Sequence, residues 1–147
     1  MSRVQVALNV SNVDEAVAFY SKLFNTEPAK RRPGYANFAI TDPPLKLVLI
    51  EGAGKPGSLN HIGVEVGSTG EVVTEAARLK AQGFELRHED NVTCCYAVQD
   101  KFWINGADDR EWEVYTVLAD APQSVQTPAP QPTEAAPSCC GPKTTAA

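Results

Sequence analysis

The sequence lacks the features that mark a membrane or secreted protein. No apolar run approaches the roughly 18 residues that a membrane-spanning helix needs, and residues 1–10 lack the basic and continuous apolar parts of a signal peptide. The four cysteines form two adjacent pairs, a spacing that suits neither a secreted disulfide framework nor a CxxC zinc site. We therefore expect a cytoplasmic protein with no membrane partner, whose cysteines are free thiols.

A large basic surface is also missing. The chain of 147 residues carries 13 Lys and Arg against 18 Asp and Glu, for a formal net charge of −5. Its one basic run, residues 30–32, is typical of a solvated strand edge. This balance argues against a nucleic-acid partner. The expected partners are small molecules or protein, and the sequence leaves a homodimer open.

The C-terminal segment has few of the residues that build a hydrophobic core. Residues 121–147 contain no aromatic residue, one valine and six of the 11 prolines. Such a segment buries too little apolar surface to offset the entropy lost on ordering. We predict one folded domain over residues 1–119 and a disordered Pro/Ala/Thr-rich tail over residues 120–147.

The folded part contains the same order of elements twice. Residues 3–10 alternate between apolar and polar, as a half-buried strand does. A helix follows at once, with Ser11 and Asp14 as its predicted capping box. Three strand-like runs come next, at about residues 27–32, 35–40 and 45–51.

After a glycine-rich connector the order begins again. Residues 59–66 alternate like the first strand, and the helix that follows is predicted to be capped by Ser68 and Glu71. Strands follow near residues 84–89, 95–104 and 111–118. Two β-α-β-β-β modules, about 3–51 and 59–118, predict an α+β fold with one curved sheet.

The alternation also places polar residues on the face of the sheet that the helices leave open. Gln5 and His61 occupy equivalent positions on the first strands of the two modules. Glu113, Tyr115 and Val117 share that face if the last strand keeps its phase. We expect this concave face to form a pocket.

This arrangement resembles the vicinal oxygen chelate superfamily, the group of glyoxalases and extradiol dioxygenases. The resemblance implies that paired modules curl around a divalent metal and that Gln5, His61 and Glu113 are its ligands. An imidazole, a carboxylate and an amide oxygen can cap one face of an octahedral cation and leave positions open for substrate and dioxygen. An amide oxygen is a weaker ligand than imidazole, so manganese, zinc and nickel stand as alternatives to iron.

The adjacent cysteines Cys94 and Cys95 point to a soft element. Sulfur donors attract ions such as As(III) and Cd(II), and two thiolates can replace two labile ligands of a trivalent arsenical. Neighbouring residues of a regular strand face opposite sides, so joint binding predicts a loop over residues 91–95, with the next strand starting near Tyr96. The alternative is one buried and one exposed cysteine without a shared role.

Four segments together resemble the carbon–arsenic lyases of this superfamily, which include proteins described as cadmium-induced. They are YANFAI at 35–40, PPLKLVL at 43–49, TCCY at 93–96 and EWEVY at 111–115. The resemblance implies an enzyme that uses Fe(II) and dioxygen to cleave the carbon–arsenic bond of trivalent organoarsenicals. Its substrates would be methylarsenite or reduced aromatic arsenicals, and arsenite would be released in arsenic detoxification.

The same resemblance assigns roles outside the metal ligands. Cys94 and Cys95 would bind the arsenic atom, and Tyr96, Phe38 and Tyr115 would line the pocket for the organic group. The tail pair, Cys139 and Cys140, would serve as accessory thiols or be incidental. Two rival functions stay open: a thiol protein that binds cadmium or arsenic without chemistry, and another dioxygenase or isomerase of the superfamily.

Overall fold

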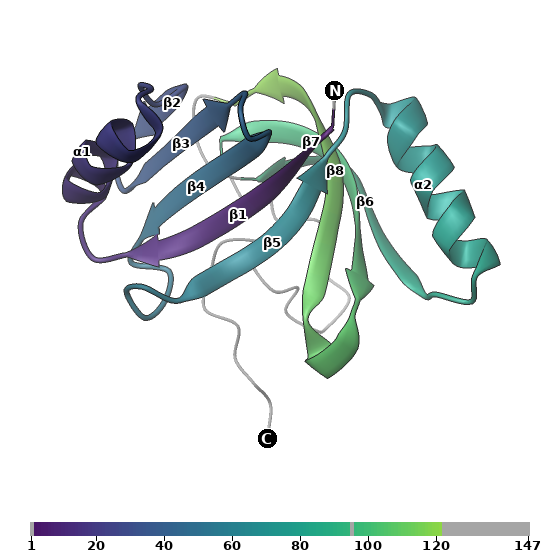
Figure 1. Ribbon diagram of the computed structural model, residues 1–147. Helices are drawn as coiled ribbons and strands as arrows, with labels where there is room; N and C mark the ends of the chain where they lie inside the picture. The colour runs from purple at the N-terminus through teal and green to yellow at the C-terminus, as the bar shows by residue number, and fades with distance from the viewer. Residues whose placement is uncertain (1, 95, 122–147) are drawn as a thin grey trace.

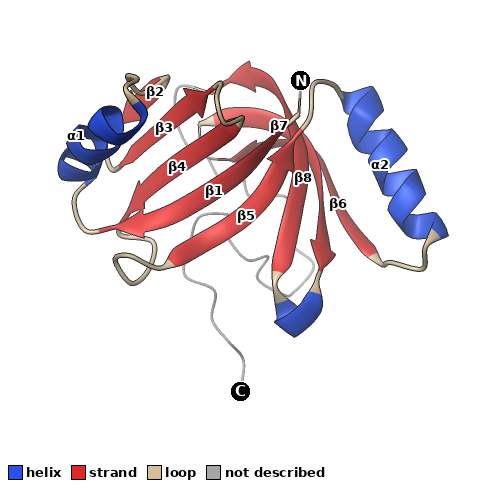
Figure 2. Cartoon of the chain, in the orientation of Figure 1, coloured by secondary structure: helices blue, strands red, loops and turns tan. Residues whose placement is uncertain are grey.

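A curved sheet and two α-helices make up the described part of the chain, residues 2–94 and 96–121 of a computed structural model (Figure 2). The first module runs β1 (Arg3–Val10), α1 (Val13–Phe24), β2 (Lys30–Arg32), β3 (Tyr35–Ile40) and β4 (Leu45–Glu51). The second runs β5 (Leu59–Glu65), α2 (Thr69–Ala81), β6 (Leu86–Cys94), β7 (Ala97–Asn105), a short 3-10 turn (Ala107–Asp109) and β8 (Glu111–Asp120). The predicted repeat of β-α-β-β-β is confirmed.

The two modules join along their first strands. The eight strands follow the order β2-β3-β4-β1-β5-β8-β7-β6, so β1 and β5 lie side by side at the centre and run antiparallel. Each of them also pairs in parallel with the last strand of its own module, β4 or β8. Figure 1 shows the remaining strands curling away from this centre as two walls. The predicted curved α+β sheet is therefore confirmed.

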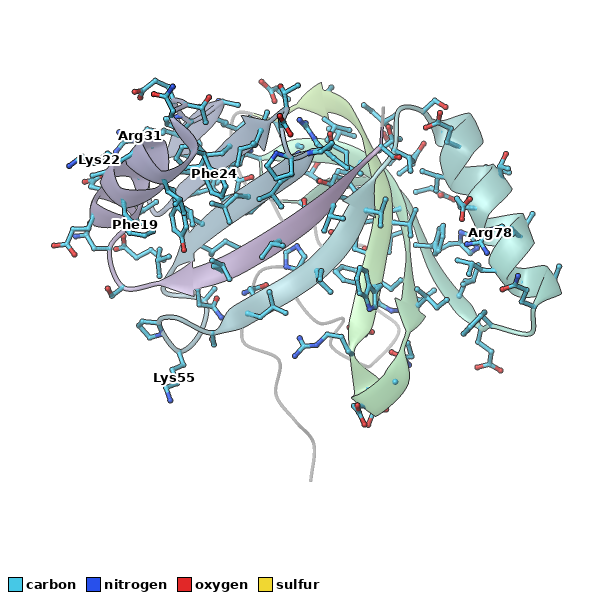
Figure 3. All side chains as sticks on the ribbon, viewed as in Figure 1. Phe19, Lys22, Phe24, Arg31, Lys55 and Arg78 are labelled. Carbon is cyan, nitrogen blue, oxygen red and sulfur yellow. The ribbon has the colours of Figure 1, made fainter. Side chains whose placement is uncertain are left out.

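The helices cover the outer face of the sheet. α1 contacts β3 and β4, while α2 contacts β7 and β8, so the helices lie near opposite ends of the sheet (Figure 1). Under α1 the strands supply a buried apolar cluster that includes Phe38, Leu47 and Leu49, and a smaller cluster around Phe102 lies under α2. Phe19 projects away from this packing and is 60% exposed (Figure 3). The apolar side of the alternation thus faces the helices.

Side-chain caps begin both helices. Ser68 accepts a hydrogen bond from the backbone N–H of Glu71, as predicted. For α1 the cap is Asn12, whose Oδ1 accepts from the backbone N–H of Glu15 at 2.9 Å, and the predicted cap at Ser11 is wrong by one residue. Asparagine caps as well as serine does, because both offer a short side-chain oxygen. No helix of the described residues is both long and apolar enough to span a membrane.

The β6–β7 hairpin differs from the expected loop. β6 extends through Cys94, which pairs with Ala97 of β7, so a loop over residues 91–95 is wrong up to position 94. Asn91 has a φ of 51°, and a register shift lies beside it. A bulge of this kind bends a strand without ending its pairing. The next strand begins directly after Tyr96, close to the predicted start.

Candidate functional site

Three side chains predicted as metal ligands converge on the concave face. The Nε2 of Gln5 lies 3.0 Å from Nε2 of His61 and donates to Oε2 of Glu113 at 2.9 Å. Nε2 of His61 lies 3.5 Å from the same carboxylate oxygen. All three side chains are buried, with at most 4% of their surface exposed. Strands β1, β5 and β8 are neighbours in the sheet, which is why residues far apart in the sequence meet here.

A glycine makes room for this cluster. Gly63 lies opposite Gln5 on β1 and opposite Glu113 on β8. A Cβ atom at this position would lie 2.5 Å from the backbone oxygen of Glu113 and 3.0 Å from its Cβ. Real Cβ atoms do not approach other atoms this closely. The close packing of β5 against β8 at the site therefore requires glycine, which has no side chain, at position 63.

A chain of hydrogen bonds determines which nitrogen of His61 carries the proton. Nδ1 of His61 lies 2.7 Å from Oδ1 of Asn60, whose Nδ2 donates to Asn9. Asn9 in turn donates to the hydroxyl of Ser58, which donates to the backbone carbonyl of Lys55. Lys55 lies in the β4–β5 loop (Figure 3). A carbonyl only accepts, so every donor in the chain points toward Lys55 and Nδ1 of His61 must be a donor. Nε2 of Gln5 can only donate, so Nε2 of His61 accepts from it and turns its lone pair toward Gln5.

Asn60 reaches His61 because the strand is irregular at that point. Ala7 pairs with His61 and Leu8 pairs with Leu59, which leaves Asn60 as the extra residue of a β-bulge. In a regular strand, neighbours such as Asn60 and His61 would face opposite sides of the sheet. The bulge thus brings a second polar side chain onto the side of the site.

Lys101 of β7 holds the other oxygen of the Glu113 carboxylate. Its Nζ lies 3.1 Å from Oε1 of Glu113 and 3.6 Å from Oε2 of Glu89, and the lysine is fully buried. The ammonium also lies 5.3 Å from the ring centre of Trp103, a cation–π distance. With one carboxylate oxygen engaged by lysine, Oε2 of Glu113 is left facing His61.

A second polar group supports Gln5 from the other side. The hydroxyl of Tyr115 contacts Oε1 of Gln5 and lies 3.0 Å from Oε2 of Glu65. Arg3 and Lys46 each bind Glu65 at 2.7 Å. Burial raises the pKa of Glu65, but the charge and hydrogen bond of Lys46, with Arg3, outweigh it and the pKa is lowered overall. Burial, followed by the charges of Glu65 and Glu113, raises the pKa of Tyr115.

The site opens into a cavity of about 290 Å³ between the two walls of the sheet. Its lining includes Gln5, His61 and Glu113 together with Cys94 from the end of β6. Further polar lining comes from Tyr35, Asn37, Lys46 and Gln99. The candidate metal ligands and a candidate thiol thus share one chamber.

One of the four cysteines, Cys94, lies in the described part of the chain. Cys94 is buried, at 5% exposure, and is disulfide-bonded, so the prediction of a free thiol is wrong for this residue in the state shown. Cys95, Cys139 and Cys140 lie outside the described residues. Binding of an arsenical at Cys94 would therefore require its reduced form.

The three aromatic residues predicted to line the pocket have different positions. Phe38 lies in the apolar cluster beneath α1, so its assignment to the pocket is wrong. Tyr115 is fully buried beneath the cavity and contacts Gln5 rather than lining the chamber. Tyr96 packs against the cavity residue Tyr35 with ring centres 5.1 Å apart. Burial raises the pKa of Tyr35 to about 12.

The donor set fits a divalent cation that prefers nitrogen and oxygen. His61 offers a lone pair, Glu113 a negative charge and Gln5 an amide, all within one buried cluster. Among residues 2–94 and 96–121, no three or more His, Cys, Asp or Glu side chains are grouped so that they could hold a metal ion. A metal here would therefore depend on the amide of Gln5 as its third protein ligand.

Sequence reasoning missed the residues that support this cluster. Lys101 has a signal, since it alternates in phase with the buried residues Gln99 and Trp103, which places it on their face of β7. Asn60 has no such signal, because only the bulge turns it toward His61. Glu65 lies in phase with His61 on β5 and could have been placed on the same face.

Two relatives are similar to this protein over most of its length. It is 61% identical over 121 residues to the cadmium-induced protein CadI of Mycobacterium tuberculosis, covering 82% of this chain and 80% of that protein. It is 57% identical over 122 residues to the trivalent organoarsenical cleaving enzyme of Thermomonospora curvata, covering 82% of this chain and 81% of that one.

The fold has a parallel among solved structures. The Mn(II)-bound glyoxalase from Novosphingobium aromaticivorans superimposes with a TM-score of 0.55 and 21% identity, over 82% of this chain and 42% of that chain. Residues 3–114 match the Glyoxalase/Bleomycin resistance protein/Dioxygenase superfamily, the group predicted from the paired modules. The chain belongs to this superfamily.

Proposed function

We propose that the chain is an Fe(II)- and dioxygen-dependent lyase that cleaves the carbon–arsenic bond of trivalent organoarsenicals and releases arsenite. The observation that carries the proposal is that Cys94 lines the same cavity as Gln5, His61 and Glu113. The name of the Thermomonospora curvata relative, a trivalent organoarsenical cleaving enzyme, supports it at 57% identity.

Ligand chemistry separates the two tasks of the cavity. Gln5, His61 and Glu113 offer nitrogen and oxygen donors, which suit Fe(II), while the reduced thiol of Cys94, acting with Cys95, suits trivalent arsenic. When bound, iron would supply the activation of dioxygen at the positions that the three protein ligands leave open. Lys101 keeps Oε1 of Glu113 engaged, so Oε2 is the oxygen of this carboxylate that would be available to hold the metal.

Burial of the reacting groups would also favour the proposed reaction. Cys94, His61 and Glu113 are 5%, 4% and 2% exposed, so a substrate held by the thiol would be fixed beside the metal ligands with little bulk water between them. Fixing two reactants in this way converts an encounter in solution into a local step. The polar lining from Asn37 and Gln99 can orient the hydroxyl groups of an arsenical before the thiols displace them.

For methylarsenite the proposed reaction balances without a further reductant. Uptake of dioxygen by CH3As(OH)2 gives As(OH)3 and formaldehyde, with all atoms and electrons accounted for. Arsenic stays trivalent while carbon is oxidised and dioxygen is reduced. The protein then needs to supply no electrons of its own.

The test is an anaerobic reconstitution. The protein is reduced with a thiol, loaded with Fe(II), mixed with methylarsenite and then exposed to dioxygen, and arsenite is measured. We expect arsenite only when both Fe(II) and dioxygen are present. His61→Ala should abolish release while leaving arsenical binding intact, and Cys94→Ser should abolish binding itself. Failure to release arsenite from iron-loaded, reduced protein would reject the proposal.

A second candidate function is sequestration of a thiophilic ion without chemistry. The observation that favours it is the 61% identity to a protein named for induction by cadmium. Under this function, Cys94→Ser would abolish binding of cadmium or arsenic, while Glu113→Gln would change nothing measurable. A Glu113→Gln variant that binds methylarsenite but no longer releases arsenite would exclude simple sequestration.

A further inference from the structure

The amide of Gln5 presents its two ends to two different surroundings. Its Nε2 faces His61 and Glu113, and its Oε1 faces the hydroxyl of Tyr115. The nitrogen end bears hydrogens and cannot bind a cation, so the orientation of this amide decides whether the cluster can hold a metal. The nitrogen and oxygen of an amide have almost the same shape, and the hydrogen-bond partners decide which way it points.

The proton count around Tyr115 favours the opposite orientation. Its hydroxyl lies within hydrogen-bond distance of two acceptors, Oε1 of Gln5 and Oε2 of Glu65, yet a phenol has one proton to donate. Glu65 is held by Arg3 and Lys46 and can only accept. If the phenol donates to Glu65, its oxygen is left to accept, and Gln5 satisfies it by offering an N–H. Rotating the amide by half a turn achieves this.

The turned amide also suits a cation at the cluster. With Nε2 on Tyr115, Oε1 of Gln5 points toward Nε2 of His61 and Oε2 of Glu113, so three lone-pair donors face one point. Without a cation, three such acceptors would repel one another, and an N–H that donates to Glu113 is the better neighbour. The orientation of the amide is thus coupled to the presence of a cation.

We propose that Tyr115, anchored by Glu65, is a positioning residue that turns the amide oxygen of Gln5 toward the metal. The inference rests on the proposed function, since it requires a metal at Gln5, His61 and Glu113. A carboxylate ligand does not need this help, because neither of its oxygens bears a hydrogen when it is ionised. A site that uses glutamine as a ligand needs a partner that accepts the N–H, and the phenol of Tyr115 fills that place.

The test measures Mn(II) affinity, independent of catalysis. Mn(II) prefers oxygen and nitrogen donors over thiols and is followed by its paramagnetic resonance signal during equilibrium dialysis. Tyr115→Phe removes only the hydroxyl, and we expect it to weaken Mn(II) binding about 10- to 100-fold, as for other groups that orient metal ligands. Glu65→Gln, which replaces the charged acceptor of the phenol by a weaker neutral one, should weaken binding in the same direction. If Tyr115→Phe folds poorly, Glu65→Gln provides the same test.

The decisive comparison uses Gln5→Glu as a second background. A carboxylate has two equivalent oxygens and no wrong orientation, so there the effect of Tyr115→Phe should shrink to about threefold or less. Equal losses in the two backgrounds would show a merely structural role and overturn this inference alone. Wild-type protein that binds no Mn(II), or whose binding survives His61→Ala, would overturn the proposed metal site and the inference with it.

Discussion

The two modules share one topology, but their inner faces carry different chemistry. Gln5 on β1 and His61 on β5 occupy equivalent positions in the antiparallel central pair. Two residues further along, Ala7 pairs with Val48 in the first module, and Gly63 pairs with Glu113 in the second. The carboxylate of the second module thus has an apolar counterpart, Val48, in the first.

This difference explains why a repeated fold makes a single site. The second module supplies two of the three candidate ligands, His61 and Glu113, and also the buried Lys101 that supports Glu113. The first module supplies Gln5 and, with Val48, an apolar part of the cavity wall. Repetition provides the curved frame, and residues that differ between the modules provide the candidate metal ligands. The comparison can be tested by exchanging equivalent residues.

The largest effect is expected from Glu113→Val, which gives the second module the residue of the first. It removes a proposed metal ligand and leaves Lys101 buried without its closest partner. We expect loss of Mn(II) binding and a decrease of about 3–5 kcal/mol in the free energy of unfolding, measured by urea denaturation. Adding Lys101→Met should recover much of the stability but none of the metal binding. Metal binding that survives in either variant would contradict the assignment of Glu113.

The next largest effect is expected from exchanging the equivalent small residues Gly63 and Ala7. Gly63→Ala places a Cβ against Glu113 and should lower the free energy of unfolding by about 1–3 kcal/mol. Because the clash displaces Glu113, Mn(II) affinity should fall as well. The matched control, Ala7→Gly, should cost about 0.5–1 kcal/mol and leave the affinity unchanged. Equal losses of affinity in both variants would show that this site does not depend on the approach of β5 to β8.

A smaller effect is expected from Asn60→Ala, which cuts the hydrogen bond to Nδ1 of His61. Without that acceptor the ring can carry its proton on Nε2, so Mn(II) affinity should fall about 10-fold or more. Asn60→Asp restores an acceptor and should recover most of the affinity. Titration of both variants with Mn(II) checks this, and an Asn60→Ala variant with unchanged affinity would show that the hydrogen-bond chain does not set the tautomer.

The smallest effect concerns pH. The pKa of Glu65 is lowered in the folded protein, so its contribution to stability is present above its unfolded value and is lost as pH falls through the folded value. Its counterpart in the first module, Asn9, does not titrate. Between about pH 5 and 3 the free energy of unfolding of wild type should fall more steeply than that of Glu65→Gln. Parallel slopes would show that Glu65 gains nothing from Lys46 and Arg3.

Strand alternation predicts the strands and the face that the candidate ligands share, whereas their role as metal ligands follows from the family resemblance. Gln5, His61 and Glu113 stand on strands whose apolar side is clear, so their shared face follows from the period of two. Phe38 was misplaced because the resemblance, and not the phase of β3, assigned it. On that strand Tyr35 and Asn37 line the cavity, so the intervening positions face α1.

Other features depend on β-bulges and on strand register, which the alternation of apolar and polar residues does not predict. The bulge at Asn60 breaks the alternation locally and turns a residue toward His61 that the pattern places on the other side. The bulge in β6 allowed the strand to continue through Cys94, where a loop was expected. The pairing of Lys101 with Glu113 depends on the register between β7 and β8, which local sequence does not specify.

We propose that one cavity contains two chemically distinct sites, with nitrogen and oxygen donors for the metal and sulfur donors for arsenic. X-ray absorption spectroscopy identifies the atoms bound to iron and the atoms bound to arsenic in one sample. The sample is reduced protein loaded with Fe(II) and methylarsenite under anaerobic conditions. We expect only nitrogen and oxygen neighbours around iron, and sulfur neighbours with a retained carbon around arsenic. In His61→Ala the iron signal should be lost while the arsenic signal persists. Sulfur bound to iron, or arsenic without sulfur, would contradict the account.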